Sequence, residues 1–514
     1  MNATTLPVKD GFSQLLHAEW TKFRTVRGWV IGMLVAILLT VLVGLLGPAG
    51  SEISCSRPDG STCDHSLPIG PGGEAVHDSF TFVHRPMGGD GSITARVTSL
   101  TGRFLAPGGE TQADGLQPWS KAGIMVKAGT AEGASYVAVM VTGSRGVRMQ
   151  HDFTGDIAGP SGEVSVTSPK WLRLTKTGDS LTGYASADGV AWTEIGTVTA
   201  AGLRTGAETG LFAASPGYEV VTESFASVSG TFGPTQATAL FDNVGVQGGQ
   251  PQAGWASDLV GGDSDRPSGP PGFTEDGGRF TVDGTGDIAP AVESRGSAAR
   301  TIEDGLAGVF AGLIPVIVVA TLFSTSEYRR GLIQTTFAAS PRRGRVLAAK
   351  AVVLGGVSFA AGLIAAVLTV PLVQSLEEAK GLFLYPVSAW TEFRVIVGTA
   401  ALFAVVSVLA LAVGTLLRRS AGAVTAVVVA IVLPYVLAIA SVLPSGAALW
   451  LTRLTPAAGF AVQQSLPEYP QVAAAFTPVN GYFPLSPLGG FTVLCCYAAL
   501  AFGFAVVLVR RRDV

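Results

Sequence analysis

The sequence lacks a nucleotide-binding loop and the common metal-binding motifs. No Lys follows a Gly anywhere in the 514 residues, so the phosphate-cradling pattern G-x-x-x-x-G-K-[ST] cannot occur. HExxH and CxxC are also missing, and the five His are scattered along the chain. These absences exclude ATP binding through a P-loop and lead us to expect no metal site and no cofactor in this chain.

Cysteine is scarce, with four in the whole chain. Cys55 and Cys63 bracket the stretch CSRPDGSTC in a segment that we place outside the cell, where thiols can be oxidised. Two interpretations stay open for this pair: a local disulfide, or two free thiols in a loop. Cys495 and Cys496 fall in an apolar run and are interpreted as small apolar side chains.

Charged residues make up only 14% of the chain and are absent from six long apolar blocks. Each block is close to the roughly 20 residues that cross a hydrocarbon layer, and none has the polar face of a soluble core helix. We therefore predict an α-helical membrane protein with six transmembrane helices. A secondary transporter is disfavoured, because such carriers usually keep ionisable relays inside their spans. The blocks are Trp29–Leu46, Gly305–Phe323, Ala351–Val373, Val395–Leu417, Ala421–Leu443 and Leu488–Val509.

Basic residues outside the block Ser51–Asp304 are distributed unevenly. If the chain crosses six times, 15 of these 18 Lys and Arg fall on one side, and only Lys380, Arg394 and Arg453 on the other. The positive-inside rule then places both termini in the cytoplasm and the block outside. The block carries 16 Lys and Arg against 29 Asp and Glu, a net charge of −13, which argues against nucleic acid as a partner.

The first 28 residues precede the first span, at 29–47, and contain an amphipathic segment. Apolar side chains recur at helical spacing within Asp10–Gly28, with basic side chains beside them. Such a segment lies in the headgroup plane, and positive-inside anchoring is the overlapping alternative. We expect the first span to stay as an anchor, because its apolar run is longer than the roughly 7–15 residues of a signal peptide. The predicted membrane-interface residues are Trp20, Lys22, Phe23, Arg24 and Arg27.

Between the first two spans, at 48–304, the apolar period changes from that of a helix to that of a strand. SYVAVMV (135–141), KWLRLTK (170–176) and SLTGYAS (180–186) are short runs of strand-forming residues, and Asp188-Gly189 is a hairpin signal. We predict an extracellular all-β sandwich over about 78–246, inserted between helices one and two. A Gly/Pro-rich linker is expected at 247–272.

Two charged segments carry a family resemblance: EYRRGLIQTTFAASPRRGRVLAAKA (Glu327–Ala351) and HAEWTKFRTVRGW (His17–Trp29). Together with the six spans at 29–47 and 305–514, they resemble ABC transporter permease subunits of the ABC-2 type exporter class, particularly those of actinobacteria. The resemblance implies a multi-pass protein of the bacterial plasma membrane with a cytoplasmic elbow helix at 1–28. It also implies short re-entrant helices in an external loop at 444–487, and a second permease copy or a similar permease as partner.

The same resemblance implies that the loop between spans two and three docks on a separate ABC ATPase subunit, which binds the ATP. A helix that ends near Ser340-Pro341 could protrude from the membrane and present its charges to that subunit, since arginine forks suit carboxylates. For any single arginine, anchoring on anionic lipid is the competing interpretation. The predicted coupling segment is 327–345, with the coupling residues Glu327, Tyr328, Arg329, Arg330, Gly331, Arg342, Arg343 and Arg345.

The insertion departs from this class, whose loop between spans one and two is small. Its stretches SKAGIMVKAG (120–129), WLRLTKTGDSLTGYASADGVAW (171–192) and ALFDNVGV (239–246) resemble concanavalin A-like, laminin-G-like sandwiches, which commonly bind glycans. Aromatic residues in sandwich strands are mostly core. Among Trp119, Trp171, Tyr184 and Trp192, we predict that Trp171 is core and retain Trp192, beside the hairpin tip, as the candidate glycan contact.

The predicted function is therefore the permease subunit of an ATP-driven ABC exporter, with an extracellular sandwich that binds cell-wall glycan, a substrate or a partner. The alternative is a membrane-anchored glycan-binding or sensory surface protein without transport activity, although six spans exceed what an anchor needs. A surface glycosidase is disfavoured, because the E-x-D-x-E strand motif of glucanases on this fold does not occur. We predict no catalytic residue in this chain and no enzymatic activity of its own.

Overall fold

The computed structural model describes residues 11–49, 66–105, 111–204, 206–224, 227–248, 254–261, 272–292, 299–329, 342–440, 442–472 and 476–511. Cys55, Cys63, Arg330 and Gly331, which the sequence singled out, lie outside these residues.

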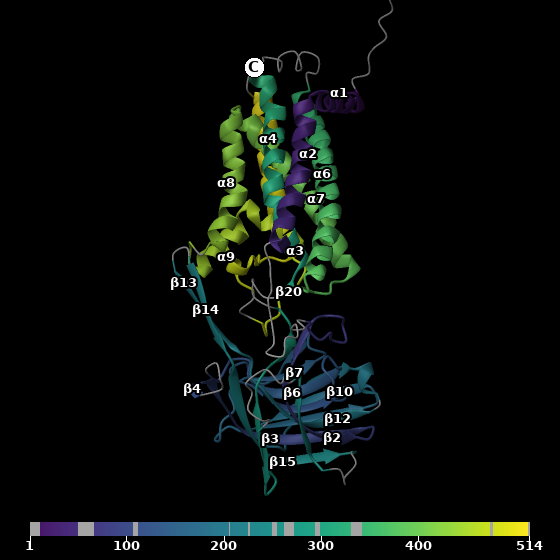
Figure 1. Ribbon diagram of the computed structural model, residues 1–514, viewed down its shortest axis with the longest axis vertical. Helices are drawn as coiled ribbons and strands as arrows, with labels where there is room; N and C mark the ends of the chain where they lie inside the picture. Colours follow the sequence, from purple (N-terminus) through teal and green to yellow (C-terminus); the bar gives the residue numbers. More distant parts are fainter. Residues whose placement is uncertain are drawn as a thin grey trace, which may run out of the picture.

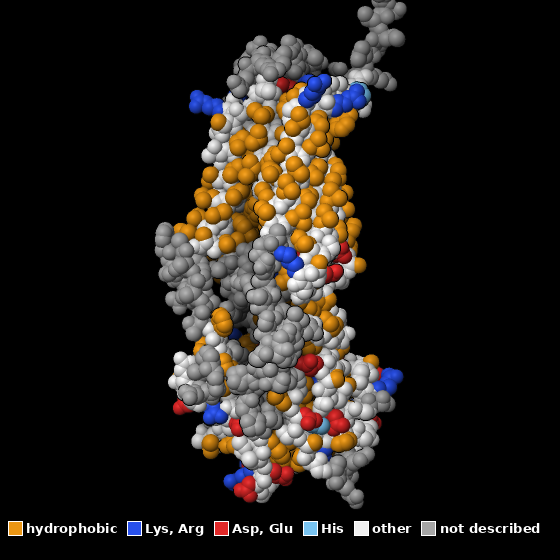
Figure 2. All heavy atoms as spheres, viewed as in Figure 1, with side chains coloured by type: hydrophobic (Ala, Val, Ile, Leu, Met, Phe, Trp, Pro, Cys, Tyr) orange, Lys and Arg blue, Asp and Glu red, His pale blue; other side chains and the backbone are white. Residues whose placement is uncertain are grey.

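Six helices among the described residues are long and apolar enough to cross a membrane, as the sequence predicted. They lie side by side in one bundle, and an apolar band covers its sides while charged side chains gather at its ends (Figures 1 and 2). Helix α7 packs against α4, α6, α8 and α10 and is the most buried of the six. The helices are α2 (Arg27–Ala49), α4 (Gly308–Arg329), α6 (Arg343–Ala379), α7 (Ala389–Leu417), α8 (Ser420–Ile439) and α10 (Pro487–Arg511).

Small residues allow α2 and α4 to approach closely. A Cβ added at Gly308 would lie 2.1 Å from the carbonyl oxygen of Thr40, and one at Gly312 would lie 2.0 Å from the Thr40 hydroxyl. Helices in lipid gain little from burying apolar surface against one another, so close backbone packing stabilises such pairs. These glycines hold the first and second candidate spans together, although about 250 residues separate them along the chain.

A short helix, α1 (Phe12–Thr25), precedes the first span and lies across the end of the bundle rather than along it (Figure 1). The turn between the helices is at Val26, whose extended backbone (φ −90°, ψ 97°) interrupts the helical hydrogen bonds. The ring of Phe23 is buried against Trp29 and Phe323, with centroid distances of 6.2 and 6.1 Å. Helix α1 is therefore held by the protein as well as being amphipathic.

The strands between α2 and α4 form two large antiparallel sheets at the opposite end of the bundle from α1 (Figure 1). The first has the order β16-β2-β12-β5-β6-β7-β8, and the second has the order β11-β10-β9-β3-β15-β18-β17, with β4 paired to β3. Small ladders join β1 to β19, β13 to β14 and β20 to β21. The strands are β1 (Val76–Asp78), β2 (Phe80–Met87), β3 (Gly91–Leu105), β4 (Thr111–Asp114), β5 (Lys121–Lys127), β6 (Tyr136–Thr142), β7 (Val147–His151), β8 (Gly155–Ala158), β9 (Lys170–Thr177), β10 (Ser180–Ser186), β11 (Thr193–Thr199), β12 (Ala207–Ala214), β13 (Tyr218–Ser224), β14 (Ser227–Gly233), β15 (Thr235–Gln247), β16 (Ala256–Val260), β17 (Phe273–Asp276), β18 (Arg279–Gly284), β19 (Ile288–Pro290), β20 (Ala299–Arg300) and β21 (Phe383–Leu384).

Apolar side chains from both large sheets fill one shared core, which includes Ile93, Leu172, Leu211 and Phe241. A second core on the other face of the first sheet contains Phe80, Tyr136, Phe153 and Phe212, among others. Successive side chains of a first-sheet strand such as β6 enter the two cores in turn, so a short run is buried on both faces. We call the part from 66 to 292 the β-domain.

The β-domain extends beyond the predicted limits of 78–246. Strand β16 lies inside the predicted linker at 247–272 and pairs with β2, while β18 pairs with β15 and carries Phe280 and Val282 into the shared core. The linker prediction is wrong at β16. This strand has only five residues, which are too few for an alternation of polar and apolar side chains to be recognised in the sequence. The rest of the predicted linker lies mostly outside the described residues, at 249–253 and 262–271.

The loops at the β-domain end of the bundle contain further short elements. α3 (Ile302–Gly305) precedes α4, while α9 (Ser445–Leu454) and the 3₁₀ helices η2 (Pro456–Gln463) and η3 (Pro478–Asn480) lie between α8 and α10. Every residue of η2 is buried, and η2 packs on α7 and α10. The ring of Phe460 stacks on Phe310 at a centroid distance of 4.0 Å, so this loop enters the bundle.

Candidate functional site

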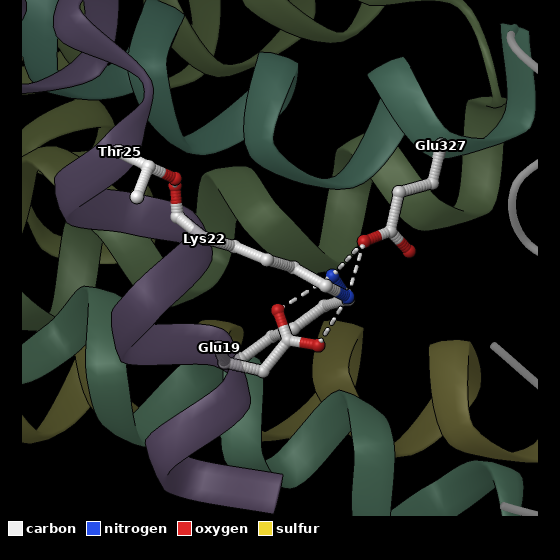
Figure 3. Close-up of polar contacts among 5 residues, drawn as sticks. Glu19, Lys22, Thr25 and Glu327 are labelled. Carbon is white, nitrogen blue, oxygen red and sulfur yellow. Dashed lines mark hydrogen bonds and ion pairs between the residues drawn. The ribbon is translucent and has the colours of Figure 1, made fainter. Parts of the chain in front are cut away.

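Four charged side chains form a cluster at the end of the bundle that carries α1. Glu19 and Lys22 come from α1, Glu327 from the end of α4 and Lys350 from the first turns of α6. Lys350 Nζ lies 2.6 Å from Glu327 Oε1 and 3.0 Å from Glu19 Oε2, and Lys22 Nζ lies 2.9 Å from Glu19 Oε1 and 3.1 Å from Glu327 Oε1. We call these four residues the charge cluster. It joins three helices through alternating charges (Figure 3).

Burial makes the charge cluster an internal feature. The side chains of Glu19 and Lys350 are 3% and 4% exposed, and that of Glu327 is 10% exposed. Lys22 is at the rim, with 39% of its side chain exposed. Burial alone would lower the pKa of the Lys22 ammonium, but hydrogen bonds and attraction from Glu19 and Glu327 raise it overall. Two carboxylates and two ammoniums balance, so the cluster is neutral as a whole.

The coupling residue Glu327 is therefore not presented to a partner, contrary to the prediction. It is turned toward Lys22 of α1 (Figure 3), because a carboxylate in this position lies within reach of two ammoniums. The sequence could not reveal the pairing of Glu327 with Lys22, because these residues are 305 positions apart along the chain. The local signal was the i,i+3 pair Glu19–Lys22, which places both charges on one face of α1.

Of the other predicted coupling residues, Tyr328 and Arg343 line a pocket together with Glu327 and Lys350. Arg418 lies over the ring of Tyr328 at 4.9 Å from its centroid, and Arg343 Nη1 donates to the carbonyl oxygen of Val509 at 3.2 Å. Arg342 and Arg345 are exposed, and Arg329 is the last residue of α4. This small pocket lies beside the cluster and is lined by Glu327, Tyr328, Arg343, Lys350 and Thr415, among others.

One oxygen of Glu327 adds an unused acceptor to this pocket. Oε2 is buried and has no hydrogen-bond partner among the described residues, and Figure 3 shows it directed away from Lys22. A buried acceptor without a donor costs free energy, so within the described residues this oxygen does not stabilise the cluster.

The predicted membrane-interface residues divide into two groups. Trp20, Arg24 and Arg27 are exposed, as expected for side chains at a lipid surface. Phe23 is 3% exposed and Lys22 belongs to the charge cluster, so these two face the protein. The predicted helix is present as α1, and part of its apolar face, at Phe23, packs against Phe323 of helix α4.

The candidate sugar-stacking residues lie in the β-domain, and the core prediction for Trp171 is wrong. Leu172 and Leu174 of β9 are buried, so strand alternation turns Trp171 and Arg173 to the outer face of the sheet. Arg173 lies over the ring of Trp192 at 3.9 Å, which covers one face of that indole. Trp119 is 7% exposed, and Tyr184 is half-buried.

The β-domain is hydrogen-bonded to the loop between α9 and α10. Gln150 of β7 donates to Gln471 Oε1 at 2.9 Å, and Gln471 Nε2 donates to the carbonyl oxygen of Phe153 at 2.9 Å. Gln150 and Gln471 are both buried. Nearer the bundle, the backbone N–H of Ser465 donates to Glu303 at 3.0 Å. The sequence contained no signal for these contacts, because the partners lie more than 160 residues apart.

Within the described residues, no group of three or more His, Cys, Asp or Glu side chains is placed to hold a metal ion. Cys495 and Cys496 are free thiols in α10, half-buried and exposed respectively.

No protein-family model and no curated protein matches the sequence. Among solved structures, the chain is similar to a GH43 protein from Bacillus licheniformis (17% identity, 26% of this chain and 25% of that one, TM-score 0.19). It is also similar to scytalido-glutamic peptidase (9% identity, 40% and 98%, TM-score 0.25) and to a functionally unknown Saccharomyces cerevisiae protein (13% identity, 36% and 82%, TM-score 0.22). The chain spans about a quarter of the GH43 structure. At these TM-scores the similarities assign no function.

Proposed function

We propose that this chain is the permease subunit of an ATP-driven ABC exporter of the ABC-2 type, in a bacterial plasma membrane. The six apolar helices form the membrane part, both termini lie in the cytoplasm, and the β-domain lies outside. ATP is bound by a separate ATPase subunit, and a second permease copy or a similar permease completes the transport path. The β-domain contacts cell-wall glycan, a substrate or a partner.

The observation that carries this proposal is the charge cluster. The segment expected to dock on the ATPase runs between the end of α4 and the start of α6, and those two ends contribute Glu327 and Lys350. Both are bound to α1 through Glu19 and Lys22. If the ATPase displaced this segment, the movement would be transmitted to the interfacial helix and to two spans together. A simple membrane anchor needs no such connection.

The orientation can be tested by labelling single cysteines on intact cells. In a variant without the four native cysteines, Val190→Cys at the β10–β11 turn is expected to react with an impermeant maleimide, because Val190 is 82% exposed. Arg419→Cys, exposed at the opposite end of the molecule, is expected to react only after the cells are opened. Equal labelling of both positions on intact cells would refute the proposed topology.

The coupling role can be tested by charge reversal at exposed arginines. Arg342→Glu with Arg345→Glu is expected to weaken binding of the co-expressed ATPase about tenfold or more, because like charges across an interface are costly. Arg419→Glu with Arg511→Glu makes the same change in net charge at the same end of the bundle and serves as the matched control. The measurements are co-purification and stimulation of ATP hydrolysis in nanodiscs.

Wild-type binding and stimulation in the first double variant would contradict a coupling role for these arginines. Equal loss in both double variants would show that they act only as a general positive surface toward lipid. If no ATPase binds the wild-type chain, the alternative of an anchored glycan-binding or sensory protein is favoured.

A further inference from the structure

A second pocket lies where the β-domain meets the bundle. It has about 510 Å³ of empty volume, which includes space that is open to solvent. Four segments that are distant in the sequence line it: the residues before β1, the residue after β19, the α6–α7 loop with the start of α7, and the α9–α10 loop. Its polar lining residues are Glu74, Tyr385, Ser388, Thr391, Ser465 and Tyr469. We call it the junction pocket.

The walls of the junction pocket are held by secondary structure and packing. Strand β20 pairs in parallel with β21, with Ala299 opposite Phe383, and so ties the chain leaving the β-domain to the loop before α7. Ala75, Ala291 and Tyr385 are buried in one small cluster beside this ladder. The pocket is therefore a formed cavity between structured segments, as ligand sites usually are.

One carboxylate in the lining of this pocket, that of Glu74, forms no ion pair with another described residue. Glu74 Oε1 is buried and has no hydrogen-bond partner among the described residues. The carboxylate lies over the turn at Gly70–Gly72, where a Cβ at Gly72 would come within 2.3 Å of Glu74 Oε2, so its position is restricted. Among the described residues that line the pocket, none is Lys, Arg or His. Burial and the charge of Glu74 raise the pKa of Tyr469, which places the two groups within electrostatic reach.

The rest of the lining suits an apolar body with hydrogen-bonding edges. Tyr385 and Tyr469 offer aromatic rings, and Leu466 and Pro467 offer aliphatic surface. Ser388 and Thr391 are at the start of α7, with their hydroxyl oxygens 3.0 Å apart. An unpaired carboxylate beside aromatic rings is the arrangement that attracts organic cations, through charge and through the ring faces.

The acidic surroundings of the junction pocket also favour a cationic ligand. The block Ser51–Asp304 has a net charge of −13, and an acidic surface raises the local concentration of cations. An anion would meet Glu74 with no basic side chain from the described lining to offset the repulsion.

We propose that the junction pocket binds an amphipathic organic cation, whose amino group donates to Glu74 and whose apolar body lies against Tyr385 and Tyr469. The inference rests on the proposed function only for the side of the membrane from which the ligand enters. Binding itself needs no ATPase, so a failure of the coupling test would leave it standing.

The test uses the purified full-length chain in nanodiscs, without ATPase, and ethidium as the probe, since ethidium is an aromatic cation with amino groups. Saturable binding is expected by fluorescence anisotropy. Glu74→Gln keeps the shape and removes the charge, and it is expected to weaken binding about tenfold or more, because a charge-assisted hydrogen bond is lost. Tyr469→Leu is expected to weaken binding while Glu74 stays in place. The matched control is Glu163→Gln, an exposed carboxylate of the β-domain with the same change in charge, which is expected to have no effect.

Three results would overturn the proposal. The first is wild-type affinity in both Glu74→Gln and Tyr469→Leu. The second is an equal loss in Glu163→Gln, which would mean that ethidium binds the acidic surface in general. The third is that the anionic dye fluorescein competes with ethidium as strongly as non-fluorescent organic cations do. Thermal unfolding of each variant identifies any that fails to fold, and Tyr469→Leu then tests the pocket independently of Glu74.

Discussion

Lys350→Met is expected to be among the most destabilising single substitutions in the membrane part, at about 3–5 kcal/mol. Lys350 is the innermost cation of the charge cluster, with 4% of its side chain exposed, and it contacts both Glu327 and Glu19. Its ammonium also lies 4.7 Å from the ring centroid of Phe323. Without it, two buried carboxylates would share only the half-exposed Lys22, and a buried charge left without its partner is costly.

The measurement is the apparent melting temperature of the full-length chain in detergent, from the fraction that remains monodisperse after heating. Lys22→Met is the matched control, because Lys22 bonds to the same two carboxylates from the exposed rim and should cost much less. The double variant Glu327→Gln with Lys350→Met should regain part of the loss, since it removes one of the unbalanced charges. If Lys350→Met melts no lower than Lys22→Met, the charge cluster does not hold the three helices together.

The same series bears on coupling. If the cluster transmits movement from the segment between α4 and α6 to α1, Glu327→Gln with Lys350→Met should keep the ATPase bound but reduce its stimulation. The exposed Arg342 and Arg345, in contrast, should affect binding itself. Separate effects on binding and on stimulation would distinguish the two parts of the mechanism.

The features that depend on local sequence could be predicted well. The six spans follow from apolar length alone, and the runs at 135–141, 170–176 and 180–186 lie on β6, β9 and β10. Burial alternates along β9 and β10, whereas β6 is buried on both faces. The hairpin at Asp188-Gly189 also joins β10 to β11, and Asp188 Oδ1 accepts from the backbone N–H groups of Val190 and Ala191 at 2.8 and 2.9 Å. These signals are contained within a few neighbouring residues.

The features that depend on distant contacts could not be predicted. Glu327 looked like a surface charge because its partners are on α1 and α6, and Trp171 looked like core because the register of β9 decides which face an aromatic takes. Strand β16 is held in the sheet by pairing with β2, which is far away in the sequence. The junction pocket belongs to the same class, since Glu74 and Tyr469 meet there only through the fold. Tertiary pairing, rather than local preference, decides each of these cases.

A second buried ion pair lies in the β-domain, on the face of the first sheet that carries the second core. Lys127 Nζ lies 2.7 Å from Asp78 Oδ2, and both side chains are fully buried. Lys127 also donates to the carbonyl oxygen of Ala134 at 3.0 Å, and Gly133 N–H donates to Asp78 at 2.9 Å. Burial raises the pKa of Asp78 despite the attraction of the Lys127 ammonium. Burial likewise lowers the pKa of Lys127 despite the attraction of the Asp78 carboxylate. The charged pair is therefore held at a cost in free energy.

Lys127→Met is expected to destabilise the β-domain by about 3–5 kcal/mol at pH 7, because the Asp78 carboxylate would stay buried without its cation. Asp78→Asn combined with Lys127→Met should recover most of this loss, since a neutral pair removes both desolvated charges. The measurement is denaturant unfolding of the fragment 66–292, followed by circular dichroism. This fragment includes every residue of both β-domain cores, which lie between Val76 and Ile288.

The pH dependence gives an independent check on the cause. A buried carboxyl whose pKa is raised in the folded state stabilises that state only when protonated, so its penalty is present at neutral pH and fades as the pH falls toward the unfolded value of 3.8. The deficit of Lys127→Met relative to the double variant should therefore shrink between pH 7 and pH 4. A deficit that stays constant over this range would mean that the unpaired charge of Asp78 is not the cause of the difference between the two variants.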